Sequence, residues 1–323
     1  SNICRKETIT MTNLKNFVID FNSIQKEINT IADSEKSYLV TAPEEYLCVP
    51  EKYSEYGLCT LGQLIGFPAN FIEKVNTTNK DLAREIIADR MKLYFKNDKN
   101  FVVREFNEKI SGVVSKNYTF FDDKQVAEIL QASPLAKKPF AYSCVTPERL
   151  HLRAIDSENP FTIGTDKSPL FFCYFVDNSM VGQSAFKVTL GIYRLACTNG
   201  MLVQRNKFSI CKQIHRGTKD IAAEFNNALA VIDSKREEIK DMLIKLSNEP
   251  AQISKLDESV AKAYLAKALI LSKKETNKVL ELYHNTYGGK SKWDMTNAIT
   301  EFARDVNSIE RRTQLEAKAL IVA

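Results

Sequence analysis

The chain has 323 residues, of which 44% are hydrophobic and 26% charged, and its formal net charge is +5. This composition is that of a globular protein with a large core, and the length favours two subdomains or one elaborate domain. No apolar run approaches the roughly 20 residues that cross a bilayer, and no apolar signal segment opens the chain, so we expect a cytoplasmic protein without a membrane partner. Ser1, Asn2 and Ile3 have the composition of an expression-tag remnant, and translation is expected to begin near Met11.

Cysteine and histidine usage argues against disulfides, metals and cofactors. The seven cysteines are scattered at positions 4, 48, 59, 144, 173, 197 and 211 and form no C-x-x-C pair, which is typical of reduced thiols. The three histidines at 151, 215 and 284 have no metal-ligand spacing. The chain also lacks the P-loop, dinucleotide-binding, zinc-protease and serine-hydrolase motifs. No cofactor and no metal are therefore expected.

Residues 11–98 are predicted to form an N-terminal helical segment. Phe17, Phe21, Ile24 and Ile28 have helical spacing within residues 14–31. Further on, Thr60 is expected to cap a short helix that Gly66, Phe67 and Pro68 interrupt, with Pro68 opening another turn. Another helix is predicted over residues 81–94.

Residues 99–217 are predicted to form an antiparallel β-rich core. FVVREF and ISGVVSKNYTFF indicate a hairpin, and DDKQVAEILQAS a helix whose Asp122 and Asp123 stabilise its start, which we favour over a metal pair. Further strands are predicted at PFAYSCVT, RLHLRAID, PLFFCYFVDN, AFKVTLGIYRLAC and KFSICKQIHR.

Residues 218–323 are predicted to be helical to the end. A helix of nearly thirty residues carries an apolar stripe that includes Phe225, Ile239, Leu243 and Leu246. Shorter helices are expected over 254–272, 274–286, 293–305 and 307–320. The predicted fold class is therefore α+β, a central and largely antiparallel sheet with a helical N-terminal segment and a helical C-terminal region.

The charge is unevenly distributed along the chain. The 42 residues between Asp177 and Asp220 contain no Asp or Glu but seven Lys or Arg, where the average acid content would give about five acids. Since +5 minus +7 leaves −2, the rest of the chain is slightly acidic. Such a concentrated basic field is typical of a protein that binds a polyanion.

The stretch RLACTNGM, residues 194–201, lies inside this basic window. Cys197 is interpreted as a small buried hydrophobe, and Asn199 with Gly200 as a turn because both tolerate positive φ. Arg194 and the cations after the turn can hold phosphates, and Tyr118 can stack on an unpaired base, whereas Phe186 and Phe208 are expected in the core. The candidate nucleic-acid-binding residues are Lys116, Tyr118, Arg194, Asn199, Arg205, Lys207, Lys212, His215, Arg216 and Lys219.

A second basic point lies next to the Gly288 and Gly289 break. It consists of Lys290, Lys292 and Trp293, the only tryptophan of the chain. The favoured interpretation is a helix start with Trp293 packed across the preceding loop, and the alternative is ligand contact.

Four motifs follow one another in a familiar order: LGQLIGFPANFIEKV, then VVREF with ISGVVSKNYTFFDD, then YRLACTNGM, then KWDMTNAITEFARD. Over residues 55–305 the chain thereby resembles a widespread family of phage- and plasmid-encoded proteins of unknown function. The family has Asp-Arg where this chain has Lys116 and Asn117, so a carboxylate is lost and a cation gained. The resemblance marks as signature positions Ser115, Tyr118, Arg194, Cys197, Asn199, Gly200, His215, Trp293 and Asn297.

The sequence leads to three hypotheses about function. The first is a phage or plasmid protein, in the host cytoplasm, that binds nucleic acid, foremost single-stranded DNA, in recombination, replication or annealing. A sheet with a helical tail also resembles, loosely, the single-strand annealing proteins of phages. The second is a factor that sequesters a host defence or replication protein through the long helix 218–247, and a homo-oligomer fits either. The third, less favoured, is an enzyme such as a nuclease that uses Asp122, Asp123 or His215.

Overall fold

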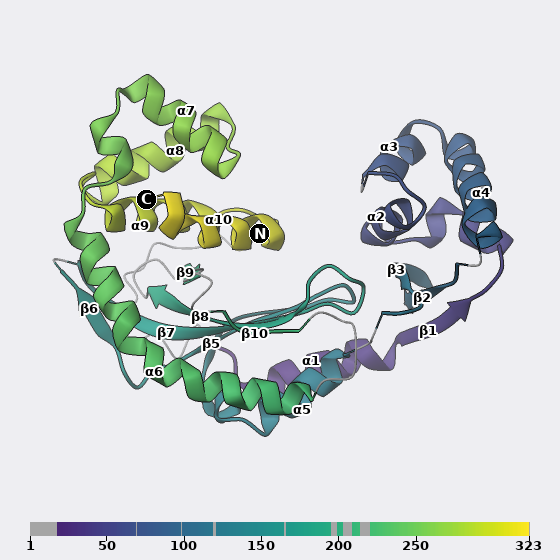
Figure 1. Ribbon diagram of the computed structural model, residues 1–323, viewed down its shortest axis with the longest axis horizontal. Helices are drawn as coiled ribbons and strands as arrows, with labels where there is room; N and C mark the ends of the chain where they lie inside the picture. Colours follow the sequence, from purple (N-terminus) through teal and green to yellow (C-terminus); the bar gives the residue numbers. More distant parts are fainter. Residues whose placement is uncertain are drawn as a thin grey trace.

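The computed structural model describes residues 18–68, 70–97, 99–118, 121–164, 166–194, 199–202, 209–213 and 220–322. The molecule is a crescent whose middle is a β-sheet (Figure 1). N-terminal helices form one tip of the crescent and C-terminal helices form the other, and both rise on the same side of the sheet. The predicted α+β class is confirmed.

The large sheet has seven strands in the order β10-β8-β7-β5-β4, with β6 paired to β7 and β9 paired to β8. All of the described pairings in it are antiparallel. Its strands are β4 (Phe140–Val145), β5 (Leu150–Ile155), β6 (Phe161–Ile163), β7 (Asp166–Asn178), β8 (Phe186–Arg194), β9 (Asn199–Leu202) and β10 (Ser209–Gln213). The five strands predicted here are confirmed, and β6 and β9 were not predicted.

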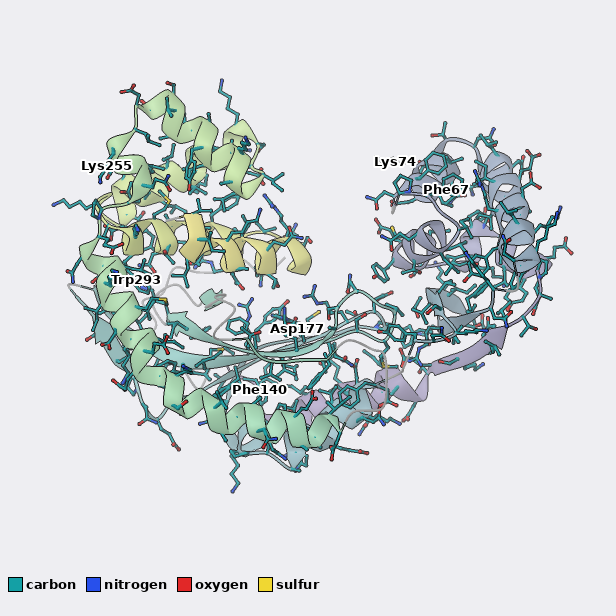
Figure 2. All side chains as sticks on the ribbon, viewed as in Figure 1. Phe67, Lys74, Phe140, Asp177, Lys255 and Trp293 are labelled. Carbon is teal, nitrogen blue, oxygen red and sulfur yellow. The ribbon has the colours of Figure 1, made fainter. Side chains whose placement is uncertain are left out.

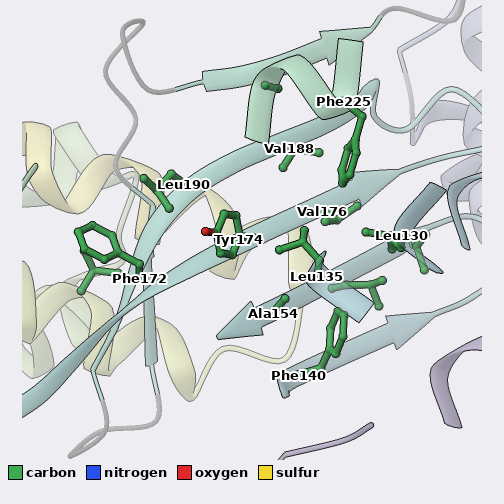
Figure 3. Close-up of a cluster of buried hydrophobic side chains, with 14 of the residues drawn as sticks. Leu130, Leu135, Phe140, Ala154, Phe172, Tyr174, Val176, Val188, Leu190 and Phe225 are labelled. Carbon is green, nitrogen blue, oxygen red and sulfur yellow. The ribbon is translucent and has the colours of Figure 1, made fainter. Parts of the chain in front are cut away.

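Three helices cover the convex face of this sheet: α1 (Phe21–Asp33), α5 (Asp123–Gln131) and α6 (Ile221–Asn248). A short 3₁₀ turn, Pro134–Lys137, follows α5. Alternate strand residues such as Phe172, Val176 and Leu190 point into one apolar core with Leu130 and Phe225 from the helices (Figure 3). Phe186 belongs to this core as expected, whereas Phe17 and Phe208 lie outside the described residues. The apolar stripe of α6 is therefore buried against the sheet.

The concave face of the sheet carries a smaller core and a buried ionic network. Phe171, Cys173, Phe175 and Tyr193 pack there together with Ala317 of the C-terminal region. Next to them lies Asp177 of β7 (Figure 2). Its partners are Arg149, which immediately precedes β5, His151 of β5 and Lys187 of β8.

The N-terminal tip has its own core around a three-stranded sheet, β1 (Glu35–Val40), β2 (Phe101–Phe106) and β3 (Lys109–Ser115). Asn107 and Glu108 both have positive φ and make the tight turn between β2 and β3. The helices α2 (Glu55–Leu64), α3 (Phe71–Thr78) and α4 (Lys80–Lys96) cover it, preceded by 3₁₀ turns at Glu45–Cys48 and Pro50–Lys52. The N-terminal segment predicted over residues 11–98 is thus divided between two cores. Helix α1 packs on the large sheet, whereas β1 to α4 share a separate core with the β2–β3 hairpin.

The start of the second helix differs from its prediction. Ser54, rather than Thr60, caps α2 by accepting a hydrogen bond from the Gly57 amide at 3.1 Å. Thr60 lies within the helix, where its hydroxyl accepts from the Val113 amide of β3 at 3.0 Å. A Cβ on Gly57 would lie 2.1 Å from the Ile110 carbonyl oxygen. Glycine at this position therefore allows α2 to pack directly on β3.

The C-terminal tip contains α7 (Glu258–Leu269), α8 (Lys273–Glu281), a π-helical turn η7 (Leu282–Thr286), α9 (Lys292–Arg304) and α10 (Ile309–Val322) around a separate core. A 3₁₀ turn, Gln252–Lys255, precedes α7. Gly288 and Gly289 have positive φ at the predicted break. Among the described residues no helix is long and apolar enough to cross a bilayer.

Candidate functional site

The strands that the structure describes within the acid-free segment, β8, β9 and β10, lie on one side of the large sheet, with β9 and β10 at its edge. Strand β9 lies along one half of β8 and β10 along the other half, so both occupy the same edge position. The register puts Lys212 of β10 opposite Lys187 of β8. On its other side Lys187 pairs with Asp177 of β7, whose carboxylate lies 3.9 Å from its Nζ. Among the described residues of the segment, Lys187 and Arg194 of β8 and Lys212 of β10 therefore lie at or next to this edge of the sheet.

The Asn199–Gly200 prediction needs a correction here. Both residues belong to strand β9, where Asn199 pairs with Arg194 and Gly200 with Tyr193. Strand β8 ends at Arg194 and β9 begins at Asn199, and residues 195–198 lie outside the described part of the chain. The Asn-Gly pair favours a turn locally, but the sequence does not show where pairing with β8 begins.

A pocket of about 470 Å³ lies where the C-terminal tip meets the sheet, and we call it the charged pocket. Arg194 at the end of β8 lines it together with Lys290, Trp293 and Asn297. The Arg194 guanidinium lies 5.4 Å from the ring centre of Tyr287, which lines the same pocket. The two basic points that were separate in the sequence, at Arg194 and at Lys290, thus meet in one site.

The start of α9 shapes this pocket. Ser291 caps the helix, and its partner Asp294 accepts hydrogen bonds from the amides of Lys290 at 3.1 Å and Ser291 at 2.8 Å. The Asp294 carboxylate is thereby balanced by the positive end of the helix. Trp293 is 3% exposed and packs in the main core, so the predicted helix start with a packed tryptophan is confirmed.

Lys292 lies apart from the charged pocket. Its Nζ is 2.8 Å from the Glu249 carboxylate, and both residues line another pocket of about 730 Å³ beside α6. The structure therefore separates Lys290 and Trp293 from Lys292, although the sequence joined the three into one basic point.

A pocket of about 620 Å³ opens between the N-terminal tip and the β7–β8 connection, and we call it the neutral pocket. No Asp, Glu, Lys, Arg or His is among the described residues that line it. Tyr118 borders it, with its hydroxyl donating to the Ser179 carbonyl at 2.7 Å, and burial raises the Tyr118 pKa. Lys116 is exposed two residues before Tyr118. The polar lining comes from Tyr56, Thr60, Gln63, Ser115, Tyr118 and Ser184.

The four sequence motifs consequently fall at two sites. Gln63 of the first motif and Ser115 and Tyr118 of the second line the neutral pocket. Arg194 of the third and Trp293 and Asn297 of the fourth line the charged pocket. Sequence reasoning singled out Tyr118 and Arg194 but missed Gln63 and Ser184, which have no charge or ring to mark them.

The buried ionic network was also missed. His151 Nδ1 lies 2.6 Å from Asp177 Oδ1, and Arg153 donates from Nε to His151 Nε2 at 3.3 Å and from its terminal nitrogen to Glu316 of α10 at 2.8 Å. Burial would raise the Asp177 pKa, but His151, Lys187 and Arg149 hold it well below its usual range. Burial lowers the His151 pKa, which fits a neutral imidazole whose Nε2 accepts from Arg153. Because His151 is fully buried and both ring nitrogens are engaged, this His–Asp pair holds the fold together.

The adjacent carboxylates predicted to start a helix do so. Asp122 caps α5 in a reciprocal pair with Gln125. Asp123 is buried, accepts from the Asn178 amide at 2.7 Å, and has its pKa raised to about 7 by burial. The described residues contain no group of three or more His, Cys, Asp or Glu placed to hold a metal ion.

Several predicted contact residues lie outside the described part of the chain. These are Arg205, Lys207, His215, Arg216 and Lys219; Cys197, which the sequence indicates to be a small buried hydrophobe, lies outside it as well. Asn199 and Lys212 are described through their strands β9 and β10.

Comparison with known proteins gives one match. Neither the curated proteins nor the solved structures contain a match to this chain. A family profile, Domain of unknown function (DUF932), matches residues 111–320, which include β3, the large sheet and the C-terminal helices. The match covers more than half of the chain, and the protein therefore belongs to the DUF932 family.

Proposed function

We propose that this protein binds single-stranded nucleic acid, DNA foremost, along the edge of the large sheet formed by β8, β9 and β10. In keeping with its resemblance to phage and plasmid proteins, we propose that the binding serves recombination or replication of a mobile element, including annealing of complementary strands. The protein itself performs no bond-breaking chemistry in this proposal.

One observation carries the proposal: Arg194, which ends β8 inside a sequence segment of 42 residues with seven Lys or Arg and no acid, lines one pocket together with a second cation, Lys290. A row of cations without interspersed acids attracts phosphates from a distance and neutralises them on contact. Arg194 is suited to a bidentate phosphate contact, and Lys290 to a point-charge contact.

The surroundings support a single strand over a duplex. Tyr287 lines the charged pocket, and Tyr56 and Tyr118 line the neutral pocket. Aromatic walls can stack on unpaired bases, which a duplex keeps inside. The competing protein-partner hypothesis relied on the long helix, but Phe225, Ile239 and Leu243 of α6 are fully buried against the fold.

The test is a titration of fluorescently labelled single-stranded DNA, duplex DNA and RNA with the purified protein, at salt from about 50 to about 200 mM. We expect the tightest binding to single-stranded DNA and a steep loss of affinity as salt rises. Arg194→Ala and Lys290→Ala should each reduce the slope of log affinity against log salt by about 0.7, the contribution of one phosphate contact on a single strand.

Lys26→Ala is the matched control, because Lys26 is an exposed lysine of α1 on the convex side of the sheet. It should leave both the affinity and the slope unchanged. Absence of salt-dependent binding to any of the three nucleic acids at low salt would refute the proposal, and preference for RNA or duplex DNA would refute its single-stranded DNA form.

A further inference from the structure

The charged pocket lies at the foot of the C-terminal tip, where Trp293, one of its lining residues, is buried (Figure 2). The ends of β6, β8 and α6 surround it together with the loop around Gly288 and the start of α9. Its volume of about 470 Å³ falls within the range of about 300–1,000 Å³ in which proteins hold small ligands. The pocket therefore has room for a ligand of about one nucleotide.

Two cations line this pocket, and they are held in different ways. Arg194 is half-buried, and its guanidinium lies 5.4 Å from the centre of the Tyr287 ring. A guanidinium that stacks on a ring through its face donates hydrogen bonds through its edge, in the planar fork that matches a phosphate. Lys290 is exposed and forms no ion pair with the described residues, whereas Lys292 lies 2.8 Å from the Glu249 carboxylate. The charge of Lys290 is thus available to a ligand.

The carboxylate among the described lining residues, Asp294, is already bound. Its Oδ2 accepts hydrogen bonds from the amides of Lys290 at 3.1 Å and Ser291 at 2.8 Å. The positive end of α9 stabilises its charge as well. The described lining side chains therefore set two cations against one carboxylate that the helix start has satisfied, and this balance favours an anionic ligand.

Asn297 adds a buried polar side chain to the lining. It is 3% exposed, and the surface that remains borders the pocket. Its backbone carbonyl accepts from Thr300 Oγ1 at 3.2 Å, but no described residue exchanges a hydrogen bond with its side-chain amide. Buried polar groups nearly always have a partner. The Asn297 amide can donate to an oxygen of an anion in the pocket.

A phosphate at the end of a nucleotide chain matches these donors better than a phosphate within the chain. A terminal phosphate monoester carries a charge of about −1.5 to −2 at pH 7 and has three acceptor oxygens. A phosphodiester inside a strand carries a single charge and has only two oxygens outside its ester bonds. Arg194, Lys290 and Asn297 provide three donor groups in one pocket, one for each oxygen of the monoester.

We propose that the charged pocket binds the terminal phosphate monoester of a nucleotide, with Arg194, Lys290 and Asn297 donating to its oxygens. The inference rests on the proposed function for the source of this phosphate, which is the end of a bound single strand. It makes the protein a reader of strand ends. A free mononucleotide carries the same chemical group, so the experiment separates the two sources.

The experiment compares single strands of one DNA sequence that carry a phosphate on the 5′ end, on the 3′ end or on neither. Each is labelled at an internal base and titrated with the whole chain while fluorescence anisotropy is recorded. One of the phosphorylated strands should bind about ten-fold tighter than the strand with two hydroxyl ends, the effect of one further charge-assisted hydrogen bond. The ratio of the two affinities reports on the pocket, because every contact that both strands make cancels.

Lys290→Ala and Asn297→Asp should each bring this ratio close to one. The first variant removes a cation, and the second places another carboxylate in the pocket. Lys292→Ala is the matched control and should keep the ratio of the wild type, because Lys292 lies at the same helix start but is paired with Glu249 and lines the other pocket. Urea unfolding checks the fold of each variant, and Lys290, being exposed, tests the inference even where Asn297→Asp does not fold.

Three outcomes would overturn the inference. Equal affinity for the three strands would do so while leaving the proposed function intact, and a ratio that Lys290→Ala leaves unchanged would place the phosphate elsewhere. Displacement of the phosphorylated strand by a deoxynucleoside monophosphate at a lower concentration than by the same strand unlabelled would make the free nucleotide the ligand. Absence of binding to every strand would refute the proposed function itself.

Discussion

Asp123 places an ionisable group where water does not reach. The residue is 7% exposed at the start of α5, and burial raises its pKa to about 7, with the nearby Glu35 and Asp122 adding to the rise. The Asn178 amide and Arg104 act in the opposite direction. Because an unfolded aspartate has a pKa near 4, the folded chain holds a proton there that the unfolded chain releases.

This difference predicts how Asp123→Asn changes stability with pH. With a folded pKa above the unfolded value, the contribution of Asp123 is fully present below about pH 4 and is lost as pH rises towards 7. An amide still accepts from Asn178 and does not ionise. The free energy of unfolding of Asp123→Asn minus that of the wild type should therefore grow by about 1.4 kcal/mol per pH unit up to about pH 7.

Urea unfolding of both proteins across this pH range measures the difference. Asp122→Asn is the matched control, since asparagine caps a helix as well as aspartate does and the change occurs at the same helix end. For Asp122→Asn, the difference in free energy of unfolding from the wild type should not grow with pH. Parallel stability profiles for Asp123→Asn and the wild type would show that the buried carboxyl does not retain its proton.

The two adjacent acids also show what sequence can and cannot establish for single residues. A cap is a local property, so the pattern DDKQ predicted the role of Asp122. The burial of Asp123 depends on Asn178, which lies 55 residues away at the end of β7. No pattern near Asp123 signals that contact.

At the scale of elements, α7 ends on an unusual residue. Ile270 adopts the left-handed conformation, with φ 57° and ψ 52°, although 70% of its side chain is exposed. This conformation costs a residue with a Cβ about 1–2 kcal/mol and costs glycine almost nothing. The carbonyls of Leu269 and Ile270 accept hydrogen bonds from Arg311, at 2.6 and 2.7 Å, and hold this helix end in place.

We therefore expect Ile270→Gly to stabilise the protein by about 0.5–1 kcal/mol, after the greater flexibility of glycine in the unfolded chain is counted. The exposed side chain contributes little burial, and both carbonyl contacts remain available. Ile270→Ala distinguishes relief of backbone strain from loss of the exposed apolar side chain, since it shortens the side chain but keeps a Cβ. Thermal unfolding in which alanine stabilises as much as glycine would contradict backbone strain as the cause.

Sequence periodicity recovered α6, β7 and β8 but missed β1, β6 and β9. The apolar stripe of α6 and the alternating apolar residues of β7 and β8 can be recognised from the sequence alone, because each segment buries its own apolar residues. By contrast β1, β6 and β9 have three to six residues, and each is defined by its pairing: β1 with the distant β2, and β6 and β9 with the adjacent strands β7 and β8. Leu39, 56% exposed in β1, illustrates how little its own sequence says about burial.

At the scale of the molecule, the crescent depends on contacts across long sequence separations. The N-terminal tip meets the sheet where Gly112 of β3 passes so close to Val181 that a Cβ would lie 2.4 Å from its side chain. The charged pocket likewise joins Arg194 and Lys290, which lie 96 positions apart. Sequence identified both cations as candidates, but only folding shows that they share one site.

The C-terminal tip is tied to the sheet by a buried ion pair between Glu316 of α10 and Arg153 of β5. Both side chains are at most 3% exposed, and two hydrogen bonds of 2.8 and 3.0 Å join them. Arg153 also lies over the rings of Tyr142 and Phe175 and donates to His151. Removing one partner leaves a buried charge without compensation.

Glu316→Ala should therefore destabilise the protein by about 3–5 kcal/mol in urea unfolding. Replacing both partners by methionine should recover most of this loss, because apolar side chains of similar volume need no counter-charge. A loss of less than about 1 kcal/mol for Glu316→Ala would match the stability contribution of an exposed ion pair. It would mean that the apolar contacts of α10 hold the C-terminal tip on the sheet without Glu316.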